Sequence, residues 1–168
     1  MKKALQWTLA LAAVYQVYLV TRPPSGLSAE SILAGRAIAG GAVPYRDFFL
    51  HVGPLVAYLY AALYSVPVYA WFGLVFVGFN LLAAWGVYAI EKQVLSQDWY
   101  PGVGAILYMV AAPALSGSMM YVETAEAAFG IWAVYFALRK KKWLTLLMVV
   151  LATATKQTGI VFSVLLFS

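Results

Sequence analysis

The sequence predicts an all-α polytopic membrane protein with about five transmembrane helices and a long first external loop that carries interfacial helices. Composition is the first reason, because 64% of the 168 residues are hydrophobic, only 10% are charged and the mean hydropathy is +0.84. Such a chain has too little polar surface to cover a water-soluble globule. The second reason is that its basic residues lie at the edges of long apolar stretches, as topology signals do in membrane proteins.

Five apolar stretches approach or exceed the roughly 20 residues that a helix needs to cross a bilayer core about 30 Å thick. The first, residues 4–21, is followed by Arg-Pro-Pro and has no small-residue cleavage site, so we expect a retained helix instead of a removed signal peptide. The other four stretches are residues 68–90, 102–120, 121–138 and 143–167.

The orientation is predicted from residues 139–142, Arg-Lys-Lys-Lys, because basic residues are enriched in cytoplasmic loops. A further apolar stretch, residues 54–66, is too short for a span and would reach about 20 Å as a helix. If it crossed the bilayer, the basic run would lie outside, opposite Lys2 and Lys3. If it lies in the interface, the N-terminus and the basic run are both cytoplasmic, and we favour this alternative.

Residues 22–67 then form one external segment, for which the sequence predicts two interfacial helices within a single transmembrane domain that covers residues 1–168. Ser28 and Glu30 have the character of an N-cap and a first-turn acid, and a Gly-Gly pair after Ile38 would end this first helix. After an extended connector, Gly-Pro starts the second helix, whose tyrosines suit the membrane interface.

Composition also excludes several kinds of site. The chain has no cysteine and a single histidine, His51, which argues against disulfides, thiolate metal sites and histidine-dependent nucleophilic catalysis. No metal site is assigned, although a carboxylate site for Mg²⁺ or Mn²⁺ stays open. The net charge of +5 does not indicate nucleic acid, because the cations flank apolar segments that membrane lipids would surround.

Polar residues inside the apolar stretches need partners. Lys156 falls near the middle of residues 143–167, where a charge costs about 2.5–3.5 kcal/mol. We expect the helix to break at residues 155–159, with Lys156 meeting a lipid phosphate in a cavity. The alternatives are snorkelling to the interface or pairing with a neighbouring acid such as Glu126. Gln16 and Asn80 are expected to form hydrogen bonds between helices.

Four motifs along the chain resemble those of one enzyme superfamily. They are Gly-Ala-Val-Pro-Tyr-Arg-Asp-Phe-Phe at 41–49, Gly-Pro-Leu at 53–55 with His51 before it, Tyr-Val-Glu-Thr-Ala-Glu at 121–126, and Ala-Thr-Lys-Gln-Thr-Gly at 154–159. On these residues the chain resembles the amino-terminal part of a GT-C class membrane glycosyltransferase, a superfamily that includes protein O-mannosyltransferases and the lipid A aminoarabinose transferase.

The resemblance implies transfer of a sugar from a polyprenyl-phosphate-linked donor to an acceptor at the outer face of a prokaryotic plasma membrane. An acidic residue on an external loop would position or deprotonate the acceptor, and a cation would meet the departing phosphate. The resemblance assigns candidate catalytic roles to Asp47, Glu30 and Glu123. It assigns candidate substrate-binding roles to Lys156, Arg46, His51, Glu126, Tyr45 and Gln157.

These residues also have structural alternatives. Asp47 follows Arg46, so the two can form a solvated loop pair, and Glu30 can simply stabilise a helix dipole. Glu123 and Glu126 are three residues apart and share a helix face, where they can bind a metal or an amino acceptor or merely be solvated. His51 has the alternative of being a hydrogen-bonded interfacial residue.

Two other functions remain as alternatives. One is a non-catalytic membrane subunit that presents a lipid-linked sugar to a second membrane subunit. In its favour, charged residues of the family are missing from this chain. The family's Asp-Glu pair would fall near Gly26-Leu27, and the two charges before its motif proline would fall near Leu50 and Val52. The other is a small transporter or flippase, for which the expected internal repeats are not found. The sequence ends within an apolar run, from which we expect a fragment or an amino-terminal half.

Overall fold

The computed structural model of the chain describes residues 10–18, 29–50, 52–64, 69–95, 102–115 and 122–167. Within these ranges the chain is helical, with one isolated β-bridge between Pro44 and Phe48 and no strand. The predicted all-α class is therefore confirmed for the part of the chain that the structure describes.

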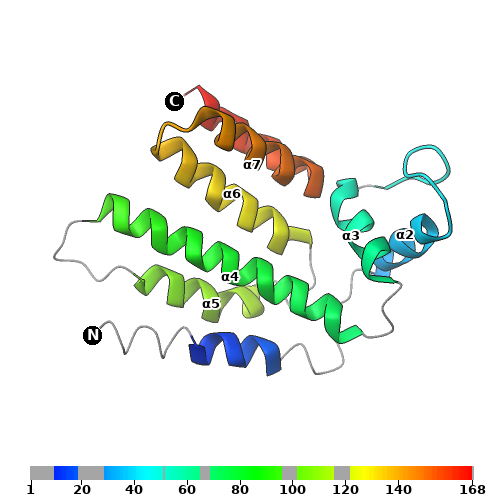
Figure 1. Cartoon of the computed structure of the whole chain (residues 1–168), viewed down its shortest axis with the longest axis horizontal. Helices are drawn as coiled ribbons and strands as arrows, with labels where there is room; N and C mark the ends of the chain where they lie inside the picture. The colour runs from blue at the N-terminus through cyan, green and yellow to red at the C-terminus, as the bar shows by residue number, and fades with distance from the viewer. Residues whose placement is uncertain are drawn as a thin grey trace.

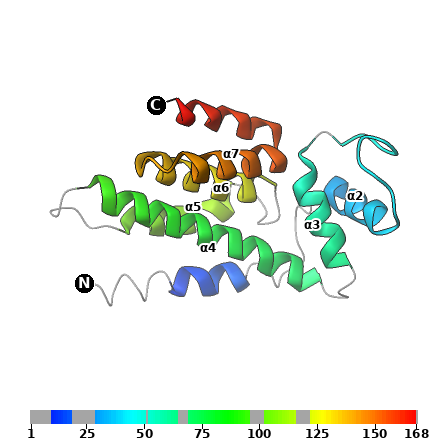
Figure 2. The ribbon, with the colours of Figure 1, turned by 45° about the horizontal axis from the view of Figure 1, so that its top comes forward.

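The elements are, in chain order, a helix over residues 10–18, α2 (Ala29–Ala39), α3 (Pro54–Tyr64), α4 (Tyr69–Val94), α5 (Val103–Leu115), α6 (Val122–Leu138), α7 (Lys142–Thr155) and the 3₁₀ helix η1 (Gln157–Leu166). The helix over residues 10–18 and helices α4 to α7 run along a common direction, while α2 and α3 pack together at one end (Figures 1 and 2). We call this end the α2–α3 end.

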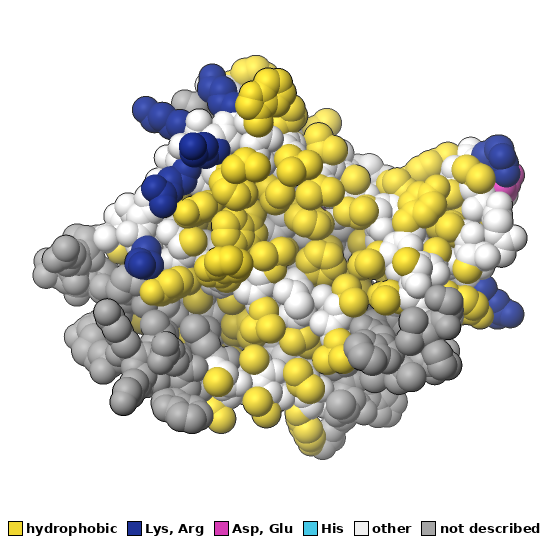
Figure 3. All heavy atoms as spheres, in the orientation of Figure 1, with side chains coloured by type: hydrophobic (Ala, Val, Ile, Leu, Met, Phe, Trp, Pro, Cys, Tyr) yellow, Lys and Arg dark blue, Asp and Glu magenta, His cyan; other side chains and the backbone are white. Residues whose placement is uncertain are grey.

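The opposite end carries a cluster of Lys and Arg side chains (Figure 3). It comprises Lys92 in the last turn of α4 and residues 139–142 in and after the turn between α6 and α7. We call it the basic end. The α2–α3 end contains the segment that the sequence predicts to be external. The length of the helices thus separates this segment from the basic run.

The long helices carry many exposed apolar side chains, and a few polar residues are buried among their apolar core residues. Gln16, Asn80 and Thr145 are buried, whereas large side chains such as Trp85 and Leu107 are exposed. So many exposed large apolar side chains are unusual for a water-soluble protein. It is the pattern expected of helices that face lipid and use polar side chains to contact one another.

The predicted hydrogen bonds between helices are confirmed. Gln16 Nε2 donates to the Met109 carbonyl oxygen at 2.9 Å and thereby joins the first described helix to α5. Tyr108 Oη of α5 donates to Asn80 Oδ1 of α4 at 3.3 Å. The bond from Gln16 is buried among apolar side chains, which strengthens it, and the bond from Tyr108 is partly buried.

One described helix, α4, is long and apolar enough to cross a membrane, over Leu74–Val94 (21 residues, mean hydropathy 1.6). The predicted spans at 102–120 and 121–138 appear as helices of 13 and 17 residues, and parts of the predicted spans 4–21 and 102–120 lie outside the described residues. The structure therefore supports one span by length and composition, and the five-span topology stays a prediction.

The stretch predicted as the last span does not cross in one helix. Helix α7 ends at Thr155, Lys156 is extended (φ −150°, ψ 141°), and η1 then runs back beside α7 (Figure 2). The predicted break is confirmed, but the single crossing over residues 143–167 is wrong. Gly159 explains the reversal, because it lies against the backbone of Ala152 and Thr153 and leaves no room for a Cβ atom.

The two segments predicted as helices within residues 22–67 are helical, and their place at a membrane interface stays a prediction. Helix α2 ends at Ala39 and is followed by Gly41, whose φ of 95° suits glycine, and α3 begins with Pro54 in its first turn. Gly35 of α2 lies against Tyr60 of α3 so closely that a Cβ atom would meet the tyrosine. The pair therefore packs through a small residue facing a large one.

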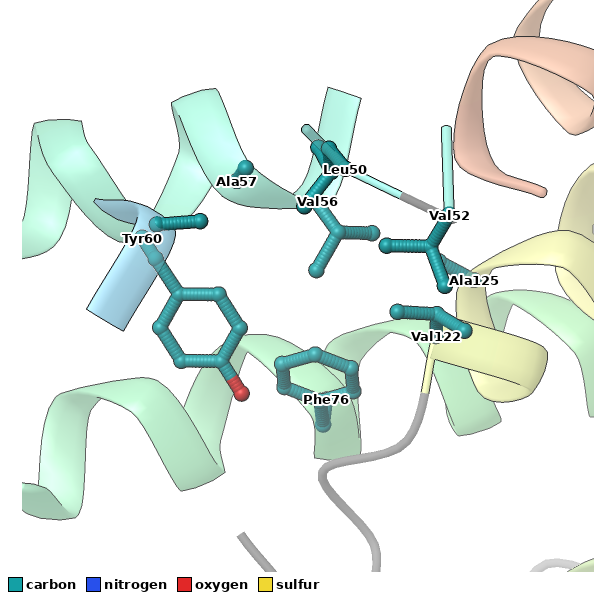
Figure 4. Packing of buried hydrophobic residues seen from close by; sticks show 9 residues of the cluster. Leu50, Val52, Val56, Ala57, Tyr60, Phe76, Val122 and Ala125 are labelled. Carbon is teal, nitrogen blue, oxygen red and sulfur yellow. The ribbon is translucent and has the colours of Figure 1, made fainter. Parts of the chain in front are cut away.

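A buried cluster attaches this pair to the long helices (Figure 4). Tyr60 of α3 lies 6.1 Å from Phe76 of α4 between ring centroids, and Val122 at the start of α6 joins the same cluster. Leu50 and Val52 are 1% and 8% exposed and belong to it as well. The positions where the resemblance expects charges are thus core positions in this chain.

At the basic end, Glu91 of α4 fixes the start of α5. Its two carboxylate oxygens accept hydrogen bonds from the backbone N–H groups of Gly102 at 2.7 Å and Gly104 at 2.6 Å. These donors have no partner within α5, so the carboxylate acts as a cap supplied by the preceding helix.

Candidate polar site at the α2–α3 end

A polar cluster lies where the first turn of α6 meets the turn between α7 and η1. Lys156 Nζ contacts Glu123 Oε1 at 2.7 Å as a hydrogen-bonded ion pair. Thr158 Oγ1 donates to Glu126 Oε1 at 2.5 Å. We call these four side chains the polar cluster. They form two adjacent links between α6 and the α7–η1 turn.

Local sequence explains why the four side chains align. Glu123 and Glu126 are three residues apart on α6, so they project from one face at a helix N-terminus, where carboxylates are favourable. Lys156 is extended, while its backbone N–H still bonds to the Ala152 carbonyl oxygen at 2.9 Å and ends α7. The turn therefore presents Lys156 and Thr158 to α6 at matching positions.

The external segment reaches the same place through Gly53. A Cβ atom on Gly53 would collide with the backbone of Ala154 and Thr155, so this glycine permits contact with the end of α7. Tyr45 Oη donates to the Val52 carbonyl oxygen at 2.9 Å and holds the preceding loop to this approach. Three of the four sequence motifs, at 53–55, 121–126 and 154–159, are therefore brought together.

The polar cluster is partly open to solvent. The side chain of Lys156 is 30% exposed and that of Glu123 is 49% exposed. A ligand can reach both groups, although each already has a partner. An incoming anion would therefore exchange with Glu123 for the ammonium group, and the exchange would release a carboxylate.

The loop candidates Arg46 and Asp47 lie elsewhere and bind one another. Arg46 Nη2 contacts Asp47 Oδ2 at 2.8 Å, and the same carboxylate oxygen accepts the Val43 backbone N–H at 2.8 Å. These two bonds hold the pKa of Asp47 below its ordinary value, and the bond from Arg46 has the larger effect. The described contacts of Asp47 stay within its own loop, as the structural alternative for this pair proposed.

The remaining candidates are less constrained. Tyr45 is exposed with a φ of 64° and contributes the loop bond described above, and Gln157 is exposed beside Lys156. His51 and the side chain of Glu30 lie outside the described residues. Among the described residues, no group of three or more His, Cys, Asp or Glu side chains is arranged to hold a metal ion.

Sequence reasoning missed three residues that shape this arrangement. Thr158 had a usable signal, because it lies two residues after Lys156 within the same motif. Gly53 was noted only as part of a motif, and its backbone contact with α7 depends on tertiary structure. Glu91 had no signal at all, since it caps a helix that begins 12 residues later.

Comparison with models of known protein families, with curated proteins and with solved structures finds no match for this chain. The functional conclusion therefore depends on the geometry of the polar cluster and on the motif resemblance described above.

Proposed function

We propose that this chain is a membrane glycosyltransferase, or the amino-terminal part of one, that transfers a sugar from a polyprenyl-phosphate-linked donor. The observation that carries the proposal is the convergence of three motifs on the polar cluster. A cation, a hydroxyl group and two carboxylates beside an apolar helix bundle are the groups that a lipid-linked phosphate sugar and a nucleophilic acceptor require.

In this proposal Lys156 and Thr158 bind the donor phosphate, and Glu123 or Glu126 accepts the proton of the acceptor. The acceptor oxygen or nitrogen forms a bond to the anomeric carbon while the bond from that carbon to the phosphate oxygen breaks. Polyprenyl phosphate is the leaving group, and the Lys156 ammonium group stabilises its negative charge. No covalent enzyme intermediate is needed for this single displacement.

Binding of the donor would itself prepare the carboxylate. In the structure Lys156 is neutralised by Glu123 at 2.7 Å. When the phosphate takes over the ammonium group, Glu123 loses its partner and becomes available to the acceptor. This role favours Glu123 and Glu126 over Asp47, whose carboxylate is held by Arg46 and Val43.

The proposed placement is in a prokaryotic plasma membrane, with the basic end and the N-terminus in the cytoplasm and the α2–α3 end outside. The distribution of cations supports this orientation, because Lys92 and residues 139–142 gather at one end (Figure 3). The polar cluster would then face the outer side, where the family's lipid-linked donors are used.

A second candidate function is a non-catalytic subunit that holds a lipid-linked sugar for a second membrane subunit. The specific observation in its favour is the burial of Leu50 and Val52, because core residues replace the charges of the family motif. In this alternative the polar cluster binds the donor phosphate but no transfer follows on this chain alone.

The test compares single substitutions that remove one charge each, in sugar transfer and in donor binding. The full chain in its native membranes is supplied with radiolabelled lipid-linked sugars, and Glu123→Gln, Glu126→Gln and Lys156→Met are compared with Asp47→Asn. We expect loss of transfer in Lys156→Met and in at least one of the Glu variants, and normal transfer in Asp47→Asn. Unchanged transfer in all three polar-cluster variants would refute the site, and binding without transfer in the unmodified protein would select the subunit.

A further inference from the structure

A pocket lies at the basic end between α6, α7 and η1, away from the polar cluster. Its volume is about 750 Å³, within the range of about 300–1,000 Å³ that ligand sites occupy. Lys140 and Lys142 line it together with apolar side chains from two helices, among them Val134 and Leu138 of α6 and Leu165 and Leu166 of η1. The pocket thus joins two cations to an apolar wall.

The two lysines have no counter-charge in the described structure. Neither side chain forms an ion pair with a described residue, and none of the described carboxylates lines the pocket. Glu91, the described carboxylate at this end, is held by the backbone of α5. Both lysines are exposed, so their charge is available to a ligand.

Backbone strain at Lys140 is an independent observation. Helix α6 ends in a turn in which the N–H of Lys140 bonds to the Ala137 carbonyl oxygen and that of Lys141 bonds to Phe136, at 2.8 and 2.9 Å. Lys140 occupies the left-handed position of this turn with a φ of 55°. Glycine is the usual residue there, because a Cβ atom disfavours the conformation.

The same chain shows the usual solution at the end of α2. There the N–H of Gly41 bonds to the Ile38 carbonyl oxygen and that of Ala42 bonds to Ala37, in the same pattern of bonds. The left-handed residue is Gly41, with a φ of 95°. A lysine in the matching position of α6 therefore carries a cost that the α2 turn avoids, and strain of this kind gathers at ligand sites.

We propose that this pocket binds an anionic phospholipid of the inner leaflet, with the headgroup phosphate between Lys140 and Lys142 and an acyl chain along the apolar wall. Charge complementarity selects the ligand class, because basic pockets between membrane helices on the cytoplasmic side suit anionic headgroups. The inference depends on the proposed membrane placement but not on glycosyl transfer, and it concerns a different end of the molecule.

The test is binding of phosphatidylglycerol to the purified full chain in neutral detergent, followed by native mass spectrometry with phosphatidylcholine as the comparison lipid. Lys140→Gly and Lys142→Gln are each expected to weaken phosphatidylglycerol binding about fivefold. Lys141→Gln is the matched control, since Lys141 belongs to the same basic run but does not line the pocket, and it should leave binding unchanged.

Lys140→Gly also separates binding from folding. Glycine adopts the left-handed conformation without the Cβ penalty, so this variant should unfold at the same temperature as the unmodified chain or at a higher one. Loss of lipid binding at unchanged stability would support the proposal. Equal weakening by all three variants would refute it, because it would show diffuse attraction to the basic run.

Two further outcomes would contradict the proposed ligand. Equal binding of phosphatidylglycerol and phosphatidylcholine would exclude a role for the anionic headgroup. Displacement of the lipid by soluble glycerol 3-phosphate at matched concentration would show that the site takes a free phosphate and does not need the acyl chain. We expect neither, because the apolar wall supplies part of the binding surface.

Discussion

The two ends of the molecule differ in the ion pairs that their described side chains form. At the α2–α3 end the described side chains form two ion pairs, Lys156 with Glu123 and Arg46 with Asp47, and Glu126 accepts a hydrogen bond from the Thr158 hydroxyl. At the basic end Lys140 and Lys142 have no ion-pair partner within the described part of the chain. Paired charges can fix positions within a fold, whereas unpaired ones are available to lipid. Each prediction below perturbs one side of this contrast.

The largest effect is expected at the hairpin that brings Lys156 to the α2–α3 end. Gly159→Val would place side-chain atoms against the backbone of Ala152 and Thr153 and should lower the free energy of unfolding by about 3 kcal/mol. Thermal unfolding in detergent measures the loss. Gly78→Ala is the control, because a Cβ atom there meets nothing within 4 Å. Equal effects of the two substitutions would contradict the packed hairpin.

An intermediate effect is expected at the basic end. Unlike Lys140 and Lys142, Glu91 at this end has partners, which are backbone N–H groups at the start of α5. Glu91→Gln removes charge-assisted bonds to Gly102 and Gly104 and should cost about 1–2 kcal/mol. Gln93→Ala, an exposed change on the same helix, should cost nothing measurable. Chemical denaturation in mixed micelles compares the two, and a neutral Glu91→Gln would show that the cap is not formed.

A smaller effect is expected from the ion pair itself, because both partners are partly exposed. A double-mutant cycle of Lys156→Met and Glu123→Gln should give a coupling energy of about 0.5–1 kcal/mol in stability, which falls as salt is added. Strictly additive single and double variants would mean that the two side chains do not interact. Lys156→Met with Asp47→Asn provides the uncoupled control.

The smallest effect is expected for the exposed loop pair. Asp47→Asn should lower the unfolding temperature only slightly at neutral pH, because the pair with Arg46 is exposed to solvent. Its pKa is lowered in the fold, so its contribution is present above the ordinary aspartate pKa of about 3.9 and is lost as pH falls through the folded value. Carbon-13 titration of the carboxyl group should show that low pKa and its rise in Arg46→Ala; an ordinary value in both proteins would contradict the pair.

The sequence predicted the elements that depend on local signals. Pro54 marked the start of α3, Gly-Gly marked the end of α2, and the charge of Lys156 marked a helix break. The sequence also predicted that Gln16 and Asn80 form hydrogen bonds between helices, because polar groups in apolar stretches need partners.

Other features could not be predicted, because they depend on contacts between distant segments. The reversal of η1 along α7 depends on Gly159 fitting against the α7 backbone, which a hydropathy pattern does not encode. The choice of Glu123 over Glu126 as the partner of Lys156 depends on the register between α6 and the turn. For the same reason, the sequence left open whether Asp47 lies at the active site or only pairs with Arg46 in its own loop.

Cross-linking tests most directly whether the start of α6 and the α7–η1 turn form one site. The chain has no cysteine, so the pair Glu126→Cys and Thr158→Cys can be bridged by a short thiol-specific reagent without competing reactions. We predict efficient intramolecular bridging for this pair and none for Glu126→Cys with Asp47→Cys. Failure of the first pair to bridge, or equal bridging of both pairs, would contradict the polar cluster on which the proposed function depends.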